Sequence, residues 1–175
     1  MKARATWMLS GIALFGIAGC AGSGYGPTYS PMYRQKVTAS LPDQTGKIKM
    51  MGPAEWYPNT QGFNDLGGSL LTTGTGWVRG ILVITERDIL LLQWNRRQER
   101  YRIMKVIPLE KMKEVSLDSF GLNRRIVIQE EDYTFHSFTF LKLGGQLFID
   151  SSKTESGFQI INQLVGRLNV RLQQE

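Results

Sequence analysis

The fold is decided by a stretch that reads VRGILVITERDILLLQW, residues 78–94. Two hydrophobic runs, residues 81–84 and 89–92, lie on either side of the polar pair Glu86-Arg87. Short runs rich in Ile, Val and Leu, bounded by polar residues, are typical of β-strands, and a short polar break between two of them is typical of a hairpin. The stretch therefore predicts two antiparallel strands, over residues 77–85 and 88–94.

Similar short runs recur along the chain at intervals of about ten residues. We expect one strand before the hairpin, over residues 69–73, and five after it, over residues 101–107, 110–117, 124–129, 133–141 and 147–149. Pro108 and the acidic turn at residues 130–132 separate neighbouring runs. Seven or so short strands at this spacing predict an antiparallel sandwich or barrel.

The hydrophobic period changes from two to between three and four after residue 150, which predicts one amphipathic helix running to about residue 173. The sequence Ser152-Lys153-Thr154-Glu155 fits a capping box at its start. One face of the helix is apolar and comprises Phe158, Ile161, Val165, Leu168 and Leu172. We expect this face to close the open end or seam of the sheet.

Strands followed by one closing helix resemble the pleckstrin-homology-like superfold, and in particular its GRAM-type members. Residues 80–85 followed by 89–91 are similar to the "G-x-L-x-I-T … L" hairpin of those domains, and residues 107–115 to their "I-P-L-x-x-I-x-x-V" segment. The resemblance covers about residues 67–172. It implies a mainly β sandwich or barrel of about seven antiparallel strands, closed by a C-terminal helix. It also implies that loops at one end of the barrel receive anionic headgroups or peptides.

The N-terminus has the layout of a secretory signal peptide: Lys2 and Arg4, an uncharged stretch over residues 7–18, then Gly19-Cys20. The apolar stretch is shorter than the roughly 20 residues that a membrane-spanning helix needs. Residues 17–20, Ile-Ala-Gly-Cys, resemble the lipobox of bacterial lipoproteins. The resemblance implies cleavage before Cys20, a diacylglycerol on its sulfur and an acyl chain on the new amino group. Two or more acyl chains give lasting membrane attachment.

The residue after Cys20 is Ala21 rather than the aspartate that tends to retain Gram-negative lipoproteins in the inner membrane. The resemblance therefore implies the periplasmic face of the outer membrane, or the cell membrane in a Gram-positive source. Residues 20–46 are rich in glycine and proline and predict a flexible linker. The chain then divides into a signal peptide at 1–19, a lipid-anchored linker at 20–46 and a pleckstrin-homology-like domain at 47–175.

The composition of the 175-residue chain excludes several classes of site. Its one cysteine rules out an intramolecular disulfide, and one cysteine with one histidine leaves no thiolate–imidazole metal cluster. His136, within an aromatic strand, is predicted to be structural. An enzyme using carboxylates such as Asp118 or Asp150 is a rival interpretation, but neither lies in a recognisable catalytic motif. We expect no catalytic activity, no metal and no cofactor beyond the acyl chains on Cys20.

The chain has a net charge of +6, and its densest cluster of charge is the basic segment over residues 96–102. The candidate binding residues for an anionic partner are Arg96, Arg97, Arg100, Arg102, Lys105, Arg124 and Arg125. Arginine suits phosphate, so anionic lipid or an acidic envelope protein is the expected partner, and a solvated loop is the alternative. Nucleic acid is not expected in an exported, lipid-anchored protein.

A further alternative is a carrier or sensor of an apolar ligand. Its ligand would lie inside the barrel, in a cavity lined by Leu82, Phe135, Phe138 and Phe140. The sequence thus predicts a non-catalytic binding or scaffolding module of the envelope, with the carrier as second interpretation.

Overall fold

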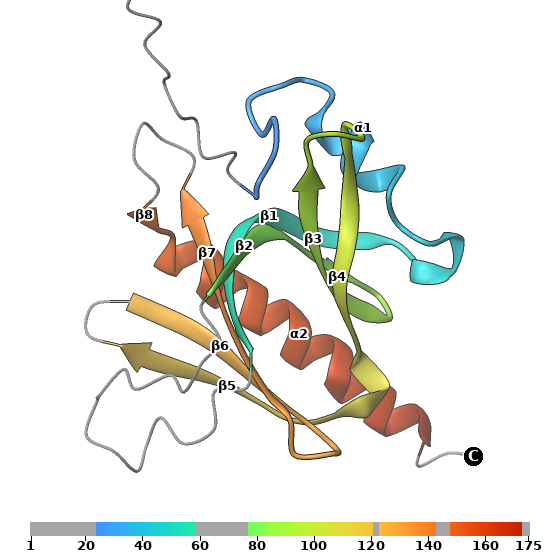
Figure 1. Cartoon of the computed structure of the whole chain (residues 1–175). Coiled ribbons are helices and arrows are strands. Elements are labelled where there is room, and N and C mark those ends of the chain that lie inside the picture. The colour runs from blue at the N-terminus through green and yellow to red at the C-terminus, as the bar shows by residue number, and fades with distance from the viewer. Residues whose placement is uncertain (1–23, 59–76, 121–122, 143–147, 173–175) are drawn as a thin grey trace, which may run out of the picture.

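The computed structural model describes residues 24–58, 77–120, 123–142 and 148–172. Within them one antiparallel sheet runs in the order β4-β3-β2-β1-β7-β6-β5, and a short β8 pairs with β7 (Figure 1). The strands are β1 Ile48–Pro58, β2 Val78–Thr85, β3 Asp88–Asn95, β4 Arg100–Pro108, β5 Met112–Phe120, β6 Asn123–Glu130, β7 Phe135–Lys142 and β8 Phe148–Ile149. The helices are α1 Tyr33–Thr38 and α2 Ser151–Leu172, with 3-10 turns at Asp43–Thr45 and Leu109–Lys111. The predicted class, a mainly β antiparallel fold closed by one C-terminal helix, is confirmed.

The predicted hairpin is formed by β2 and β3, in which Leu82 lies opposite Leu91 and Ile84 opposite Ile89. The strands expected after it are present as β4 to β8, and the strand expected at 69–73 lies outside the described residues. Strand β1 was not predicted, because Gly52-Pro53 has the composition of a turn. Proline is compatible with this strand because β7 pairs only with residues 54–58, so Pro53 lies beyond the end of that ladder.

The main hydrophobic core lies between one face of the sheet and α2, which crosses it (Figure 1). Leu82 of β2, Phe140 of β7 and Ile161 of α2 are fully buried there. The predicted helix face is confirmed for four side chains: Ile161 is a buried member of this core, and Phe158, Val165 and Leu168 pack against it. Leu164, which was not predicted, is also a member of the core. The side chain of Leu172 lies outside the described residues.

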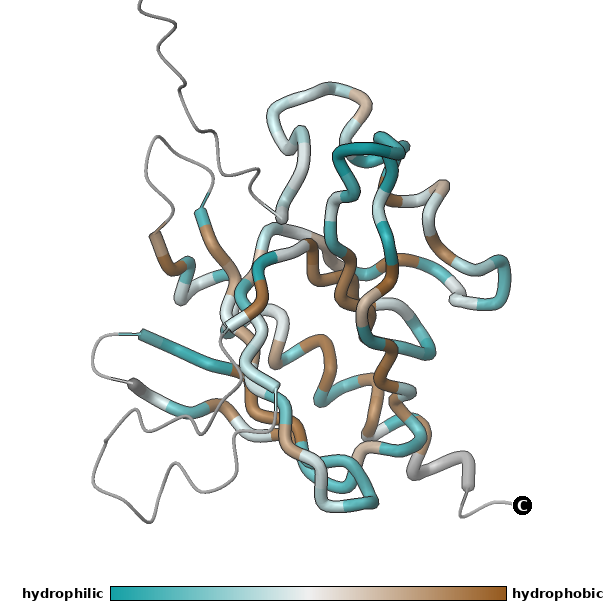
Figure 2. The backbone as a smooth tube through the Cα atoms, in the orientation of Figure 1, coloured by the Kyte–Doolittle hydropathy of each residue, from teal (hydrophilic) through white to brown (hydrophobic). Residues whose placement is uncertain are grey.

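A second hydrophobic cluster lies on the opposite face of β2 and β3. The sheet contributes four buried side chains to this cluster: Ile81 and Val83 of β2 and Leu90 and Leu92 of β3. Strands β2 and β3 are therefore covered on both faces, which explains why their sequences are continuous hydrophobic runs rather than alternating ones. Figure 2 shows these strands as a hydrophobic band within the molecule.

This second cluster is covered by residues 24–46, which we call the N-terminal strap. Tyr25 and Val37 of the strap are 2% and 0% exposed and belong to the cluster. The expectation of a flexible linker over 20–46 is therefore wrong from residue 24 onward. The apolar side chains of this stretch have no apolar neighbours nearby in the sequence, but in the fold they pack against apolar side chains of the sheet.

The glycines of the strap allow its backbone to approach the sheet closely. The Gly24 carbonyl accepts a hydrogen bond from the backbone N–H of Trp94 at 2.9 Å, and the Tyr101 hydroxyl donates to the Tyr25 carbonyl at 2.8 Å. Gly26 has a φ of +69°, and a Cβ placed there would lie 2.8 Å from Trp94 and from the Tyr101 hydroxyl. Glycine is needed at this position for both its conformation and its size.

Helix α2 begins one residue after Asp150, not at the predicted capping box. The Asp150 carboxylate accepts a hydrogen bond from the backbone N–H of Lys153 at 3.0 Å, and its carbonyl accepts from the N–H of Thr154. Asp150 is thus the N-cap, because an aspartate oxygen satisfies a free amide of the first turn. Among the described residues, neither helix has the combination of length and hydropathy required to cross a bilayer.

Candidate functional site

Four of the candidate cations lie in the turn that joins β3 to β4 or in the first three residues of β4. We call Arg96, Arg97, Arg100 and Arg102 the basic hairpin, and all four side chains are exposed. The turn is built by Asn95, whose side-chain oxygen accepts hydrogen bonds from the backbone N–H groups of Arg97 and Gln98 at 3.1 and 3.2 Å. Glu99 then adopts a φ of +47° before β4 begins. The hairpin therefore presents guanidinium groups to solvent from an ordered turn.

Helix α1 of the strap lies beside this hairpin (Figure 1). The Lys36 ammonium is 5.1 Å from the centroid of the Trp94 ring, and the rings of Tyr33 and Tyr101 meet edge to face with centroids 6.5 Å apart. Arg34 on the same helix is exposed. Sequence reasoning missed these two cations, because a predicted flexible linker has no fixed position relative to the hairpin.

The local charge balance is strongly positive. Residues 24–42 and 94–104, which end just before Lys105, together contain six cationic side chains. They contain one carboxylate, that of Glu99. The six are Arg34, Lys36, Arg96, Arg97, Arg100 and Arg102. A surface with this composition attracts phosphate groups and other anions over several ångströms at physiological salt.

The remaining candidate cations do not join this surface. The Lys105 ammonium forms an ion pair with the Glu130 carboxylate at 2.8 Å. Arg124 and Arg125 lie on β6, near the opposite edge of the sheet from β4. Arg124 donates to the Ser119 hydroxyl at 2.9 Å, whereas Arg125 is buried with its guanidinium 4.5 Å from the centroid of the Tyr57 ring. The seven predicted residues are therefore divided among three places.

A buried polar network joins four strands around His136, which is 2% exposed. Its Nε2 lies 2.6 Å from the Glu130 carboxylate, and its Nδ1 accepts a hydrogen bond from the Trp56 indole N–H at 3.2 Å. We call Trp56, Lys105, Glu130 and His136 the histidine network. Because an indole N–H can only donate, Nδ1 carries no proton and Nε2 holds the proton shared with Glu130.

The surroundings of the network favour a neutral imidazole beside an ionised carboxylate. Burial lowers the pKa of His136, and the Lys105 charge adds to this effect, while Glu130 opposes it. Burial raises the pKa of Glu130, but hydrogen bonds from Lys105 and His136 outweigh burial and hold the pKa of the carboxyl below its usual value. The negative charge of Glu130 is thus retained and paired.

This arrangement is structural rather than catalytic in form. Both nitrogens of His136 are occupied by protein partners, so the neutral ring has no free lone pair to accept a substrate proton. The prediction that His136 is structural agrees with this geometry. Within the described residues there is no group of three or more His, Cys, Asp or Glu side chains that could hold a metal ion.

The carboxylates of the enzymatic interpretation each have a local structural setting. Asp150 caps α2, and Asp118 of β5 lies opposite Arg125 in the register with β6. Neither setting resembles a pair of carboxylates arranged around a reacting bond.

The interior proposed for an apolar ligand is occupied by protein side chains where α2 meets the sheet. Leu82, Phe138 and Phe140 belong to the main core, whereas Phe135 points to the other face of β7. A Cβ added at Gly157 of α2 would lie 2.9 Å from the Phe140 ring and 3.3 Å from the Ile126 side chain. This part of the core has no room for an additional methyl group, which weighs against the carrier interpretation.

No protein-family model matches the chain, and no curated protein matches it either. Solved structures do match. An apo structure of an activated truncation of Vav1 aligns with a TM-score of 0.51 and 12% identity, covering 75% of this chain and 32% of that one. Vav1 inhibited by an allosteric inhibitor aligns with a TM-score of 0.50 and 11% identity, covering 75% of this chain and 22% of that one. The chain thus spans about a third or less of the Vav1 chains that it matches.

The Slm1 PH domain in complex with phosphoserine is also similar, with a TM-score of 0.42 and 12% identity, covering 68% of this chain and 96% of that one. At these identities the likeness concerns the fold alone. The antiparallel sheet closed by helix α2 and the two Vav1 alignments show that the chain shares its fold with part of those chains.

Proposed function

We propose that the protein is a lipid-anchored lipoprotein of the cell envelope whose pleckstrin-homology-like domain is a non-catalytic binding module. The lipobox-like residues 17–20 support acylation of Cys20, and Ala21 after it supports the periplasmic face of the outer membrane, or the cell membrane of a Gram-positive source. The fold supports a lipid- or protein-binding role, because such domains present loops from a rigid sheet.

The observation that carries the proposal is the basic hairpin beside α1. Four exposed arginines, two on one ordered turn and two at the start of β4, lie next to Arg34 and Lys36. Together they form a surface suited to phosphate oxygens, which arginine binds in a bidentate manner. Each cation near an anionic membrane surface contributes about 1 kcal/mol of attraction. We therefore propose anionic lipid headgroups as the ligand of this surface, and an acidic envelope protein as the competing outcome of the test.

The experiment replaces the four arginines of the basic hairpin by serine and measures binding of the purified mature chain to vesicles of phosphatidylglycerol and phosphatidylethanolamine. We expect affinity to fall at least about tenfold, since four favourable charges are lost. The control replaces four exposed lysines that belong neither to the hairpin nor to α1: Lys47, Lys111, Lys113 and Lys142. An equal loss in both variants would indicate attraction by net charge only. Unchanged binding in the hairpin variant would leave an acidic protein as the ligand to seek.

The anchor is tested by Cys20→Ala. We expect incorporation of radiolabelled palmitate to be abolished and the protein to move from the membrane to the soluble fraction, because a thiol is required for the thioether. Ala21→Ser, which keeps the cysteine, should retain the label. Labelling that persists in Cys20→Ala would overturn the anchor.

A further inference from the structure

The strap connects the site of the proposed anchor directly to the basic hairpin. Its first described residue, Gly24, is hydrogen-bonded through its carbonyl to Trp94, two residues before Arg96. The next residue, Tyr25, is buried and accepts a hydrogen bond from Tyr101, one residue after Arg100. The strap is thus hydrogen-bonded to both strands of the hairpin, close to the turn that joins them.

The chain between Cys20 and Gly24 limits how far the acyl chains can be from this point. An extended chain spans at most about 3.6 Å per residue, so four residues span about 14 Å. This upper limit holds whatever path these residues take. Acyl chains on Cys20 would therefore enter the bilayer close to the basic hairpin.

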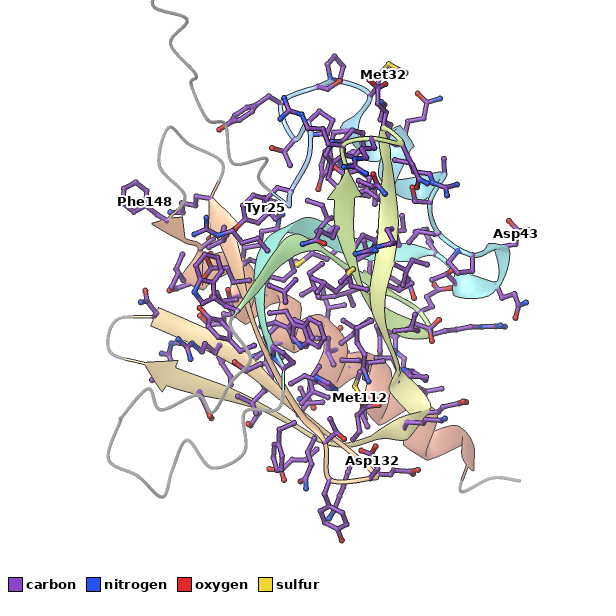
Figure 3. The ribbon with its side chains drawn as sticks, viewed as in Figure 1. Tyr25, Met32, Asp43, Met112, Asp132 and Phe148 are labelled. Carbon is purple, nitrogen blue, oxygen red and sulfur yellow. The ribbon has the colours of Figure 1, made fainter. Side chains whose placement is uncertain are left out.

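The surface around this point is suited to a layer of anionic headgroups. Tyr29 and Met32 of the strap are 74% and 53% exposed, and Met32 lies at the outer end of the molecule (Figure 3). Tyrosine is favoured at membrane interfaces because its ring is apolar and its hydroxyl polar. The same part of the chain contains no carboxylate before Asp43. The cations of the basic hairpin and α1 and the exposed Met32 share one end of the molecule (Figure 3), and Gly24, four residues after the proposed attachment point, is hydrogen-bonded to the hairpin.

We propose that the strap orients the domain: it holds the end formed by α1 and the basic hairpin against an anionic lipid surface and turns the β6–β7 end toward the aqueous phase. This inference rests on the proposed lipid anchor. Asp132 in the β6–β7 turn lies at the opposite end of the molecule from Met32 (Figure 3). The domain is then fixed near the membrane, with its far end available to other molecules, rather than suspended on a long stalk.

The test uses the full chain in bacterial membranes, with a photo-crosslinking amino acid at Gln98 in the hairpin tip or at Glu131 in the β6–β7 turn. Both positions are exposed. We expect at least about fivefold more phospholipid adduct from position 98 than from 131, since a photoprobe reacts only within a few ångströms. Suppose that mass spectrometry shows Cys20 to be acylated and that positions 98 and 131 give equal amounts of phospholipid adduct. That result would overturn the orientation but not the anchor.

A second variant distinguishes the orienting effect of the strap from the attraction of the basic hairpin itself to anionic lipid. An insertion of about twenty Gly and Ser residues between 23 and 24 leaves the packed strap intact but adds roughly 25 Å of mean reach. We expect adducts at position 98 to fall severalfold, whereas the same insertion after Asp132 should not change them. Full retention with the longer tether would show that the strap does not orient the domain.

If mass spectrometry finds Cys20 unmodified, the anchor proposal fails, and the geometry is tested separately. The Cys20 thiol of the purified mature chain is then coupled to a maleimide lipid in phosphatidylglycerol vesicles. The same excess of adduct at position 98 over 131 supports the orienting role of the strap, and equal adducts overturn it.

Discussion

The single histidine illustrates how neighbouring residues determine the chemistry of a side chain. His136 receives a hydrogen bond from Trp56 on one nitrogen and contacts Glu130 on the other. The sequence indicates a structural role, because no nucleophile motif accompanies the residue. It does not indicate the partners, since Trp56 and His136 are separated by 80 positions. Only the pairing of β1 with β7 brings them together.

The histidine network predicts that stability decreases on acidification. The pKa of His136 is lowered in the folded state. Below about pH 6.5 the imidazole therefore binds a proton more readily in the unfolded chain than in the folded one, which favours unfolding. The pKa of Glu130 is also lowered, so its stabilising contribution is present above about pH 4.3 and lost as the pH falls through its folded-state value. Both effects have the same sign.

We expect the free energy of unfolding, measured with guanidinium, to decrease from about pH 7.5 to 5, by at most about 1.4 kcal/mol per pH unit for one proton. His136→Gln cannot take up that proton and should show a shallower decrease across the same range. A wild-type chain that becomes more stable on acidification, or a variant with the wild-type slope, would contradict this account.

At the scale of elements, strands were easier to predict than the strap. A strand carries its own signal, a short apolar run between polar turns, and residues 77–142 contain several. The strap carries the opposite signal, glycine and proline, because these residues indicate flexibility unless a partner surface requires close approach. That surface is formed by β3 and β4, some 70 residues later in the chain. A local pattern cannot report such a partner.

Helix α2 gives a prediction at the same scale. Asp150→Ala should lower the free energy of unfolding by about 1 kcal/mol, because the N-cap oxygen that satisfies the Lys153 amide is lost. Ser152→Ala is the matched control and should change it by a few tenths of a kcal/mol at most, since Ser152 is exposed. Thermal and guanidinium unfolding monitored by circular dichroism would measure both. A larger loss of stability in Ser152→Ala than in Asp150→Ala would place the N-cap at the predicted capping box instead.

For the candidate site, the exposed arginines 96–102 could be predicted, because a polar basic run between two strands has no apolar partner to bury it. Lys105 was grouped with them by proximity in sequence. It instead faces Glu130, which lies 25 positions away. The contribution of Arg34 and Lys36 depends on the position of the strap and was therefore not predictable either.

The whole molecule has two hydrophobic clusters separated by the sheet, one closed by α2 and one closed by the strap. Stability of the domain therefore depends on residues that precede the predicted domain boundary at 47. A version of the chain that begins at that boundary would expose the apolar face formed by Ile81, Val83, Leu90 and Leu92. Exposed patches of this kind promote aggregation.

Val37→Ala tests the contribution of the strap to the whole molecule. Val37 is 0% exposed, and loss of two methyl groups should lower the free energy of unfolding by about 2 kcal/mol. Gln35→Ala, on the exposed side of the same helix, should have little effect. Denaturant unfolding of the mature chain measures both. Equal stability of the two variants would contradict packing of the strap.

The two clusters also place the tryptophans in separate environments, which has a spectroscopic consequence. Trp94 lies under Lys36 at the strap, Trp56 lies in the histidine network, and Trp77 is 47% exposed beneath Arg79. The fourth, Trp7, falls within the predicted signal peptide. Indole emission shifts to the red as water reaches the ring. Variants that keep only Trp94 or only Trp56 would therefore allow detachment of the strap and opening of the main core to be followed as two independent optical signals in one protein.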